Sequence, residues 1–231
     1  MNKIRKFKIK NYKKQIKPVL QMQSISKSYG QLKVLRDLNL NIMPSSITGI
    51  LGPNGSGKTT LFNILLGITK MDSGKLFINH NGKKNLDIGS LPIHQRCSEN
   101  QIKFIPQYDS LFRNLNVEDN LRAVAEIFLK NRREIDEKIE NLLSEFSLTE
   151  QRKTLAHSLS GGQKKKVAIC RALIGDCRIM VLDEPLSNID PITIEMIKDL
   201  IVKLQLTRSI TIIISDHAFE NVLQMADEVK I

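Results

Sequence analysis

Hydrophobic positions along the chain fall into two kinds of block with different periods. Short apolar runs of about five residues are typical of buried strands, and longer stretches with apolar residues every three or four positions are typical of helices. Strands separated by helices predict an α/β fold with a mostly parallel sheet and helices on its faces. The predicted strands are 47–51, 75–79, 102–106, 179–183 and 210–215, after further strands and turns within 19–51, and the predicted helices are 59–66, 118–131, 134–148, about 163–174 and 191–206.

Residues at the ends of the predicted helices support these boundaries. Asp190 can accept hydrogen bonds from the first turn of the last helix, and Pro191 suits its first position. Gly67 is suited to end the first helix. We interpret the block at about 118–174 as a helical insertion into the sheet.

The net charge of +11 at pH 7 is concentrated at one end of the chain. Residues 1–36 contain 11 Lys and Arg and no Asp or Glu, and the other 24 basic residues equal the 24 acidic ones. A neutral body offers no excess charge for a phosphate backbone, so no nucleic-acid partner is expected. The 231 residues are enough for a packed core, and the longest apolar runs are far shorter than the roughly 18 residues that span a membrane.

The basic segment is interpreted as an N-terminal extension, residues 1–18, beside a folded domain at 19–231. Eight of its charges lie between Lys3 and Lys17. Such an extension is either a disordered, solvated arm or a segment that contacts anionic lipid headgroups, where each Lys or Arg near the surface adds about 1 kcal/mol. It lacks the apolar stretch of a secretory signal.

A glycine-rich loop follows the predicted strand 47–51. Its sequence, Gly52-Pro53-Asn54-Gly55-Ser56-Gly57-Lys58-Thr59, matches the P-loop pattern between a strand and a helix. The glycines let backbone N–H groups turn toward phosphate oxygens, and the helix N-terminus adds its positive end. Lys58 supplies a charge for the β- and γ-phosphates, and the Thr59 hydroxyl can bind Mg²⁺. The loop predicts a nucleotide site.

A second stretch ends in two carboxylates. The residues 179–184 are Ile-Met-Val-Leu-Asp-Glu, which predicts a buried strand followed by acids. Asp183 can hold Mg²⁺ through water, and Glu184 can activate a water molecule against the γ-phosphate.

A third stretch, 159–163, reads Leu-Ser-Gly-Gly-Gln at a predicted helix start. A Ser-Gly-Gly turn there is a second anion-binding nest. Because the chain already has one phosphate loop, the second nest is interpreted as serving the nucleotide of a neighbouring subunit.

With these motifs together, residues 19–231 resemble the nucleotide-binding subunits of ATP-binding-cassette transporters. The resemblance implies a P-loop ATPase fold with a mostly parallel core, an antiparallel β part and a helical subdomain at about 118–174. It implies catalytic roles for Glu184, His217 and Gln107. The implied ATP-binding residues are Tyr29, Gly52, Asn54, Gly55, Gly57, Lys58, Thr59, Thr60, Ser160, Gly162 and Asp183, and the implied Mg²⁺ residues are Thr59, Gln107 and Asp183.

The family resemblance also implies partners. Two copies would form a head-to-tail homodimer with two ATP molecules at the interface, each between the P-loop of one copy and Ser160 and Gly162 of the other. The dimer would bind transmembrane permease subunits on the cytoplasmic face of the inner membrane. ATP hydrolysis would then power transport.

Within the family, residues 91–94, 107–120, 190–192 and 215–217 resemble the ATPases of lipopolysaccharide export, and we interpret the sequence as a member of that group. This implies LptF/LptG-like permeases, whose coupling helices would contact Phe112 and Arg113. Alternatively, Phe112 only packs inside the domain. Two other functions are compatible with the motifs. The first is the ATPase of another transporter, such as one for branched-chain amino acids, and the second is a soluble cassette that takes no part in transport. The sequence differs from the pattern expected of the lipopolysaccharide-export group at several positions. Tyr108, Gln163 and Ala168 stand in place of glutamates, and Ser187-Asn188 stands in place of Ala-Gly. The sequence also ends at Ile231, inside a predicted strand, without the C-terminal segment of that group.

Overall fold

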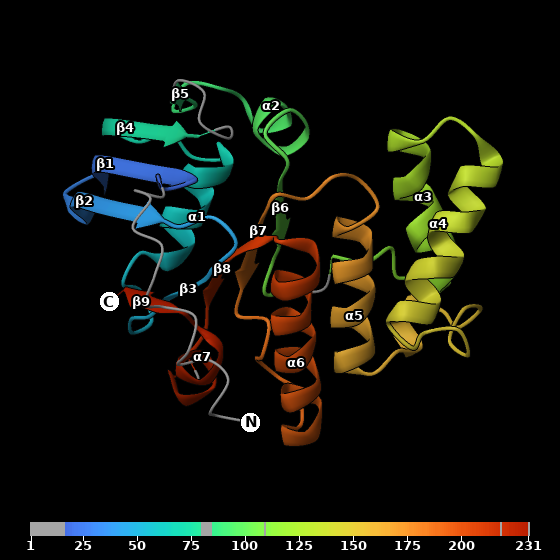
Figure 1. Ribbon diagram of the computed structural model, residues 1–231. Coiled ribbons are helices and arrows are strands. Elements are labelled where there is room, and N and C mark those ends of the chain that lie inside the picture. Colours follow the sequence, from blue (N-terminus) through green and yellow to red (C-terminus); the bar gives the residue numbers. More distant parts are fainter. Residues whose placement is uncertain (1–16, 80–84, 109, 218, 231) are drawn as a thin grey trace, which may run out of the picture.

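Figure 1 shows the fold as a computed structural model that describes residues 17–79, 85–108, 110–217 and 219–230. Residues 1–16 lie outside these ranges, so both interpretations of the basic extension stay predictions. Within the described ranges, no helix is long and apolar enough to cross a membrane.

A five-stranded parallel sheet forms the centre of the fold, as the alternation of strands and helices predicts. Its strands follow the order β6-β7-β8-β3-β9, so neighbours in space are distant in sequence. All residues of the three central strands are buried, which explains their continuous apolar runs. The strands are β3 (Ile47–Ile50), β6 (Ile102–Ile105), β7 (Ile179–Asp183), β8 (Thr211–Ser215) and β9 (Glu228–Lys230).

An antiparallel sheet with the order β2-β1-β4-β5 lies beside the parallel one. Its first two strands form a hairpin that turns at Gly30, where φ is +59°. The predicted strand at 75–79 belongs to this sheet and not to the parallel one. The strands are β1 (Leu20–Tyr29), β2 (Leu32–Ile42), β4 (Ser73–Ile78) and β5 (Leu86–Asp87).

The two faces of β7 belong to different parts of the core. Ile179 and Val181 pack in one cluster with the antiparallel sheet and with α1 (Lys58–Leu66). Met180 and Leu182 pack in a second cluster with the helices of the other face. This alternation of successive side chains places α1, and the loop before it, against the centre of the parallel sheet.

All five predicted helices are present, with ends displaced by up to three residues. In Figure 1, α3 and α4 form a lobe away from the sheets, and α5 lies between that lobe and α6. Two short helices, of six and seven residues, and one 3-10 turn of three residues were not predicted, because so few residues cannot show a helical period. The longer helices are α3 (Val117–Phe128), α4 (Arg132–Glu145), α5 (Gly161–Ala172) and α6 (Pro191–Arg208), and the short ones are α2 (Ile93–Ser98), η2 (Ala156–Ser158) and α7 (Phe219–Met225).

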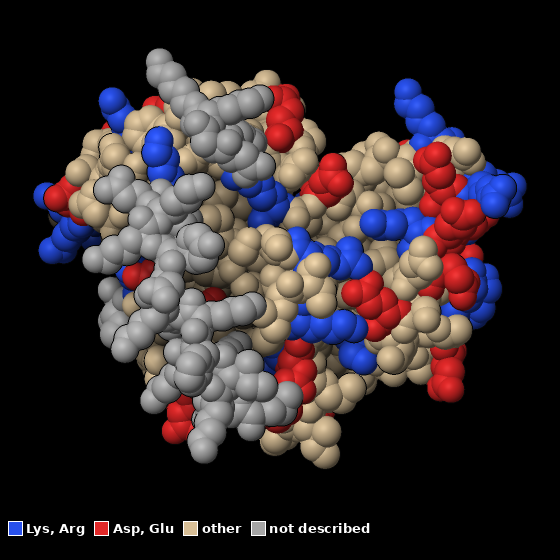
Figure 2. Space-filling model, in the orientation of Figure 1, with Lys and Arg blue, Asp and Glu red and all other residues tan. Residues whose placement is uncertain are grey.

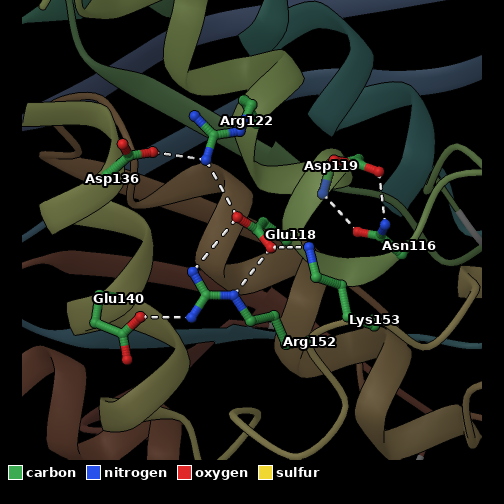
Figure 3. Close-up of polar contacts among 8 residues, drawn as sticks. All are labelled: Asn116, Glu118, Asp119, Arg122, Asp136, Glu140, Arg152 and Lys153. Atoms are coloured by element: carbon green, nitrogen blue, oxygen red, sulfur yellow. Dashed lines mark hydrogen bonds and ion pairs between the residues drawn. The ribbon is translucent and has the colours of Figure 1, made fainter. Parts of the chain in front are cut away.

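Charged side chains of both signs are interspersed over the lobe of α3 and α4 (Figure 2). One group of them forms a network around Glu118, the second residue of α3 (Figure 3). The Glu118 carboxylate, only 10% exposed, accepts hydrogen bonds from Arg152 (2.9 Å), Lys153 (2.7 Å) and Arg122 (3.2 Å). Arg152 also binds Glu140 of α4 at 2.7 Å. The network therefore holds α3, α4 and the segment after α4 together.

These hydrogen bonds, chiefly those from Arg152 and Lys153, lower the pKa of Glu118 to about 2. A carboxylate whose pKa is lowered by folding stabilises the fold above its unfolded pKa, near 4.5, and loses that contribution as the pH falls toward 2. We therefore expect Glu118→Gln to lower the free energy of unfolding by roughly 2–4 kcal/mol at pH 7. The measurement is denaturant unfolding of both proteins between pH 7 and pH 3.

Glu137→Gln is the matched control, because Glu137 pairs with Arg133 on the exposed surface of the same lobe. Surface pairs of this kind contribute about 0.3–0.5 kcal/mol. An equal loss of stability in the two variants, or a difference between Glu118→Gln and the original protein that does not shrink below pH 4.5, would contradict the assignment.

Candidate functional site

Glycines shape the loop between β3 and α1. Gly55 and Gly57 have φ angles of +78° and +100°, in the left-handed region that glycine adopts without strain. The Lys58 ammonium donates hydrogen bonds to the carbonyl oxygens of Gly52 (2.6 Å) and Pro53 (3.0 Å), which hold the side chain along the loop. Together with the N-terminus of α1, the loop can surround a phosphate with backbone N–H groups and one ammonium.

A hollow of about 290 Å³ opens beside this loop. It joins four parts of the chain: the end of β1, one residue of β2, the loop with the start of α1, and the residue after β7. Tyr29 is 50% exposed at its edge, and the Lys27 ammonium lies over its ring, 5.3 Å from the centroid. All lining residues except Val34 were predicted from the sequence, and they are Tyr29, Val34, Asn54, Gly55, Gly57, Lys58, Thr59, Thr60 and Glu184.

Oxygen atoms suited to Mg²⁺ meet at the end of β7. The Thr59 hydroxyl donates to Oδ2 of Asp183 at 3.3 Å, and the Ser215 hydroxyl donates to Oδ1 at 2.6 Å. Mg²⁺ in phosphate sites commonly uses one or two protein oxygens together with water and phosphate. Thr59 and Asp183 fit this requirement, whereas Gln107, the third predicted Mg²⁺ residue, contacts Glu184.

The three predicted catalytic residues converge on one carboxylate. Glu184 Oε2 accepts a hydrogen bond from the Gln107 side-chain amide, and Oε1 lies 2.5 Å from Nε2 of His217. Glu184 is buried and has a φ of +48°, a left-handed conformation that is strained for a glutamate and that recurs at functional sites. Gln107, Glu184 and His217 are far apart in the sequence, so the sequence did not predict that each Glu184 carboxylate oxygen would contact a different one of the other two residues.

Two further residues of this region were missed as site residues. Ser215 binds the Asp183 carboxylate, and its carbonyl oxygen accepts the Glu184 N–H at 2.9 Å. The buried Asp216 carboxylate accepts the Leu186 N–H at 3.0 Å. The available signal was the pair of polar residues at the end of β8, its last residue Ser215 and the following Asp216, because carboxyl ends of neighbouring parallel strands meet at one edge.

The Ser-Gly-Gly turn begins α5, as predicted. Ser160 and Gln163 form a reciprocal capping box, with Ser160 N to Gln163 Oε1 at 2.9 Å and Gln163 N to Ser160 Oγ at 3.2 Å. A Cβ at Gly162 would lie 2.2 Å from Cγ2 of Thr193 in α6. Among the described residues that line the hollow beside the P-loop, neither Ser160 nor Gly162 occurs. The second nest is thus separate from the first site in the same chain.

Comparison with known proteins decides the family. The profile of ABC transporters matches residues 35–187. The chain belongs to the ABC transporter family. It is 40% identical to a probable ABC transporter ATP-binding protein of Azorhizobium caulinodans, over 90% of this chain and 71% of that protein. It is 38% identical to the lipopolysaccharide export system ATP-binding protein LptB of Acidithiobacillus ferridurans, over 92% and 86%.

Solved structures agree with this assignment. The ABC cassette MJ0796, solved as a dimer in a post-hydrolysis state bound to ADP and Pi, superposes with a TM-score of 0.78 at 26% identity, over 91% of this chain and 92% of that one. The predicted family and fold are therefore confirmed, and the chain is the ATP-binding, ATP-hydrolysing subunit of an ABC transporter.

The residues predicted to contact the permease lie in the segment between β6 and α3. The Phe112 side chain is 49% exposed, and the guanidinium of Arg171 lies 4.9 Å from its ring centroid. The buried Asn120 fixes the backbone there, because it accepts the Phe112 N–H and donates to its carbonyl oxygen. Arg113 is exposed, and its carbonyl oxygen accepts the His157 N–H. Half of the Phe112 side chain is thus packed, and half is available to another molecule.

The close packing at Gly162 generates a test. We expect Gly162→Ala to lower the melting temperature by several degrees, because the new methyl group overlaps the Thr193 methyl. Thr193→Ser removes that methyl and keeps the hydroxyl that binds Asp190. The double variant should therefore regain most of the lost stability. A Gly162→Ala protein of unchanged stability, or a loss that Thr193→Ser does not reduce, would show that the two helices do not pack in this way.

Proposed function

We propose that this subunit powers lipopolysaccharide export. It would act as a homodimer bound to LptF/LptG-like permease subunits on the cytoplasmic face of the inner membrane. The observation that carries the proposal is the similarity to LptB proteins, which extends over 92% of this chain and 86% of those relatives. The half-exposed Phe112 beside the exposed Arg113 supports a contact surface for a permease helix.

A second candidate is the ATPase of another ABC transporter. A relative without a stated cargo is 40% identical, slightly more than the LptB proteins at 35–38%. The two candidates share the same hydrolysis site and differ only in the permease and the cargo.

The geometry supports the following mechanism. ATP would place its phosphates in the P-loop, and Lys58 would exchange its carbonyl partners for phosphate oxygens. Mg²⁺, held by Thr59 and Asp183, would neutralise charge on the phosphates. Glu184 would accept a proton from the attacking water while the Gln107 amide and the His217 ring hold its two oxygens in place.

The dimer completes the site in this proposal. The hollow beside the P-loop is open, and the nest at Ser160 and Gly162 lies elsewhere on the chain. In a head-to-tail pair, the N-terminus of α5 from one copy would cover the γ-phosphate in the other. Hydrolysis removes the group that both copies bind, so the pair would then separate.

We expect Glu184→Gln to bind ATP normally and to hydrolyse it at least about 100-fold more slowly, because only the proton acceptor is lost. It should also accumulate as an ATP-bound dimer in size-exclusion chromatography. Glu150→Gln, at an exposed carboxylate outside the hollow, is the control and should hydrolyse ATP normally. If the Glu184→Gln protein hydrolyses ATP near the original rate, Glu184 is not the general base.

Capture of the Glu184→Gln protein from its native membranes with ATP separates the two candidate functions. We expect a related pair of permeases of the lipopolysaccharide-export type, identified by mass spectrometry. Phe112→Ala should reduce the recovered permease while ATP hydrolysis by the isolated subunit stays unchanged. Recovery of a different permease would contradict the proposed lipopolysaccharide cargo but would remain consistent with an ABC transporter ATPase.

A further inference from the structure

The helix that carries the second nest also holds the segment after β6. Lys165, on the second turn of α5, donates a hydrogen bond from Nζ to the carbonyl oxygen of Gln107 at 2.8 Å. Arg171, further along the same helix, donates to the carbonyl oxygen of Ser110 at 2.5 Å and covers the Phe112 ring. Two basic side chains of α5 thus fix the backbone of this segment at two points.

The first of these contacts reaches the candidate catalytic centre through one residue. The Gln107 carbonyl accepts from Lys165, and the Gln107 side chain donates to the Glu184 carboxylate. At the N-terminus of α5, the capping box holds the Ser160 backbone against the first turn of the helix. The nest and the backbone of Lys165 therefore belong to the same helix, about one turn apart, and the Lys165 side chain extends from it to Gln107.

We propose that Lys165 is a positioning residue for hydrolysis, which couples the placement of the second nest to the orientation of Glu184 through Gln107. When α5 moves to meet the nucleotide of the second copy, Lys165 moves the Gln107 backbone, and the Gln107 amide turns the carboxylate. This inference rests on the proposed roles of Glu184 and of the second nest.

The surroundings of Lys165 favour a strong contact. It lines a cleft of about 210 Å³, together with Ile105, Pro106, Tyr108 and Ala168, whose lining is mostly apolar. A hydrogen bond from an ammonium to a carbonyl oxygen is stronger where water is partly excluded. The lysine can therefore hold Gln107 during a movement of the helix.

The next residue provides a matched control. Lys166 also donates to a backbone carbonyl, that of Phe146 at 3.2 Å, but Phe146 directly follows α4 within the helical lobe. Loss of this hydrogen bond removes the same chemistry from the same helix without touching Gln107. Substitution of Lys165 therefore frees the segment at Gln107, whereas substitution of Lys166 frees the end of α4 at Phe146.

The experiment compares steady-state ATP hydrolysis by Lys165→Met, Lys165→Arg and Lys166→Met. We expect Lys165→Met to lower kcat about 10-fold with little change in KM, because the P-loop is untouched while the carboxylate loses its orientation. Lys165→Arg keeps a charged donor and should restore most of kcat. Lys166→Met should keep kcat, and all three should retain the original ATP-binding stoichiometry.

A double-mutant cycle with Gln107→Ala separates positioning from stability. If Lys165 acts through Gln107, Lys165→Met should cause no further loss of kcat in the Gln107→Ala protein. A kcat of Lys165→Met near the original value, or losses that multiply in the double variant, would overturn the proposal. These results are distinct from a failure of the proposed function, which would appear as undiminished turnover of Glu184→Gln.

Discussion

The in-register pairing of β7 with β8 fixes the geometry of the candidate site. Asp183 is the pairing partner of Ser215, so the Ser215 hydroxyl meets the carboxylate that would hold Mg²⁺. Beyond this pair, the Glu184 N–H binds the Ser215 carbonyl, and the Asp216 carboxylate binds the Leu186 N–H. A register shift of one residue would turn every side chain of the shifted strand to the opposite face and break all of these contacts. The apolar runs on both faces of the two strands oppose such a shift, because both core clusters would lose their side chains.

The backbone after β7 explains one departure from the lipopolysaccharide-export group. Asn188 has a φ of +57°, in the left-handed region, and it stands where that group is expected to have glycine. Asparagine tolerates this conformation better than most residues with a side chain. The Ser187 hydroxyl donates to the Glu184 carbonyl at 2.8 Å, which closes the turn behind the carboxylate. Ser187 and Asn188 are therefore both compatible with the tight turn that follows β7.

The sequence predicts the central sheet, the long helices and the P-loop residues because each has a local cause. Buried parallel strands appear as apolar runs, helices have a period and caps, and the phosphate loop needs a fixed set of residue types. Contacts between distant segments had no such local signal. The amide of Gln107 on Glu184, the role of Asp216 and the network around Glu118 each depend on where separate elements meet. The short helices α2 and α7 escaped prediction for lack of length.

Three further departures, Tyr108, Gln163 and Ala168, lie in or near α5, and each places an uncharged side chain where a glutamate is expected. Gln163 keeps both hydrogen bonds of the capping box without a carboxylate, so the helix start retains its positive field toward an anion. Tyr108 and Ala168 line the cleft that also contains Lys164 and Lys165, where the lipopolysaccharide-export group is expected to have glutamates. The Lys165 ammonium binds the Gln107 carbonyl, and the Gln107 side chain in turn binds the candidate catalytic carboxylate of Glu184.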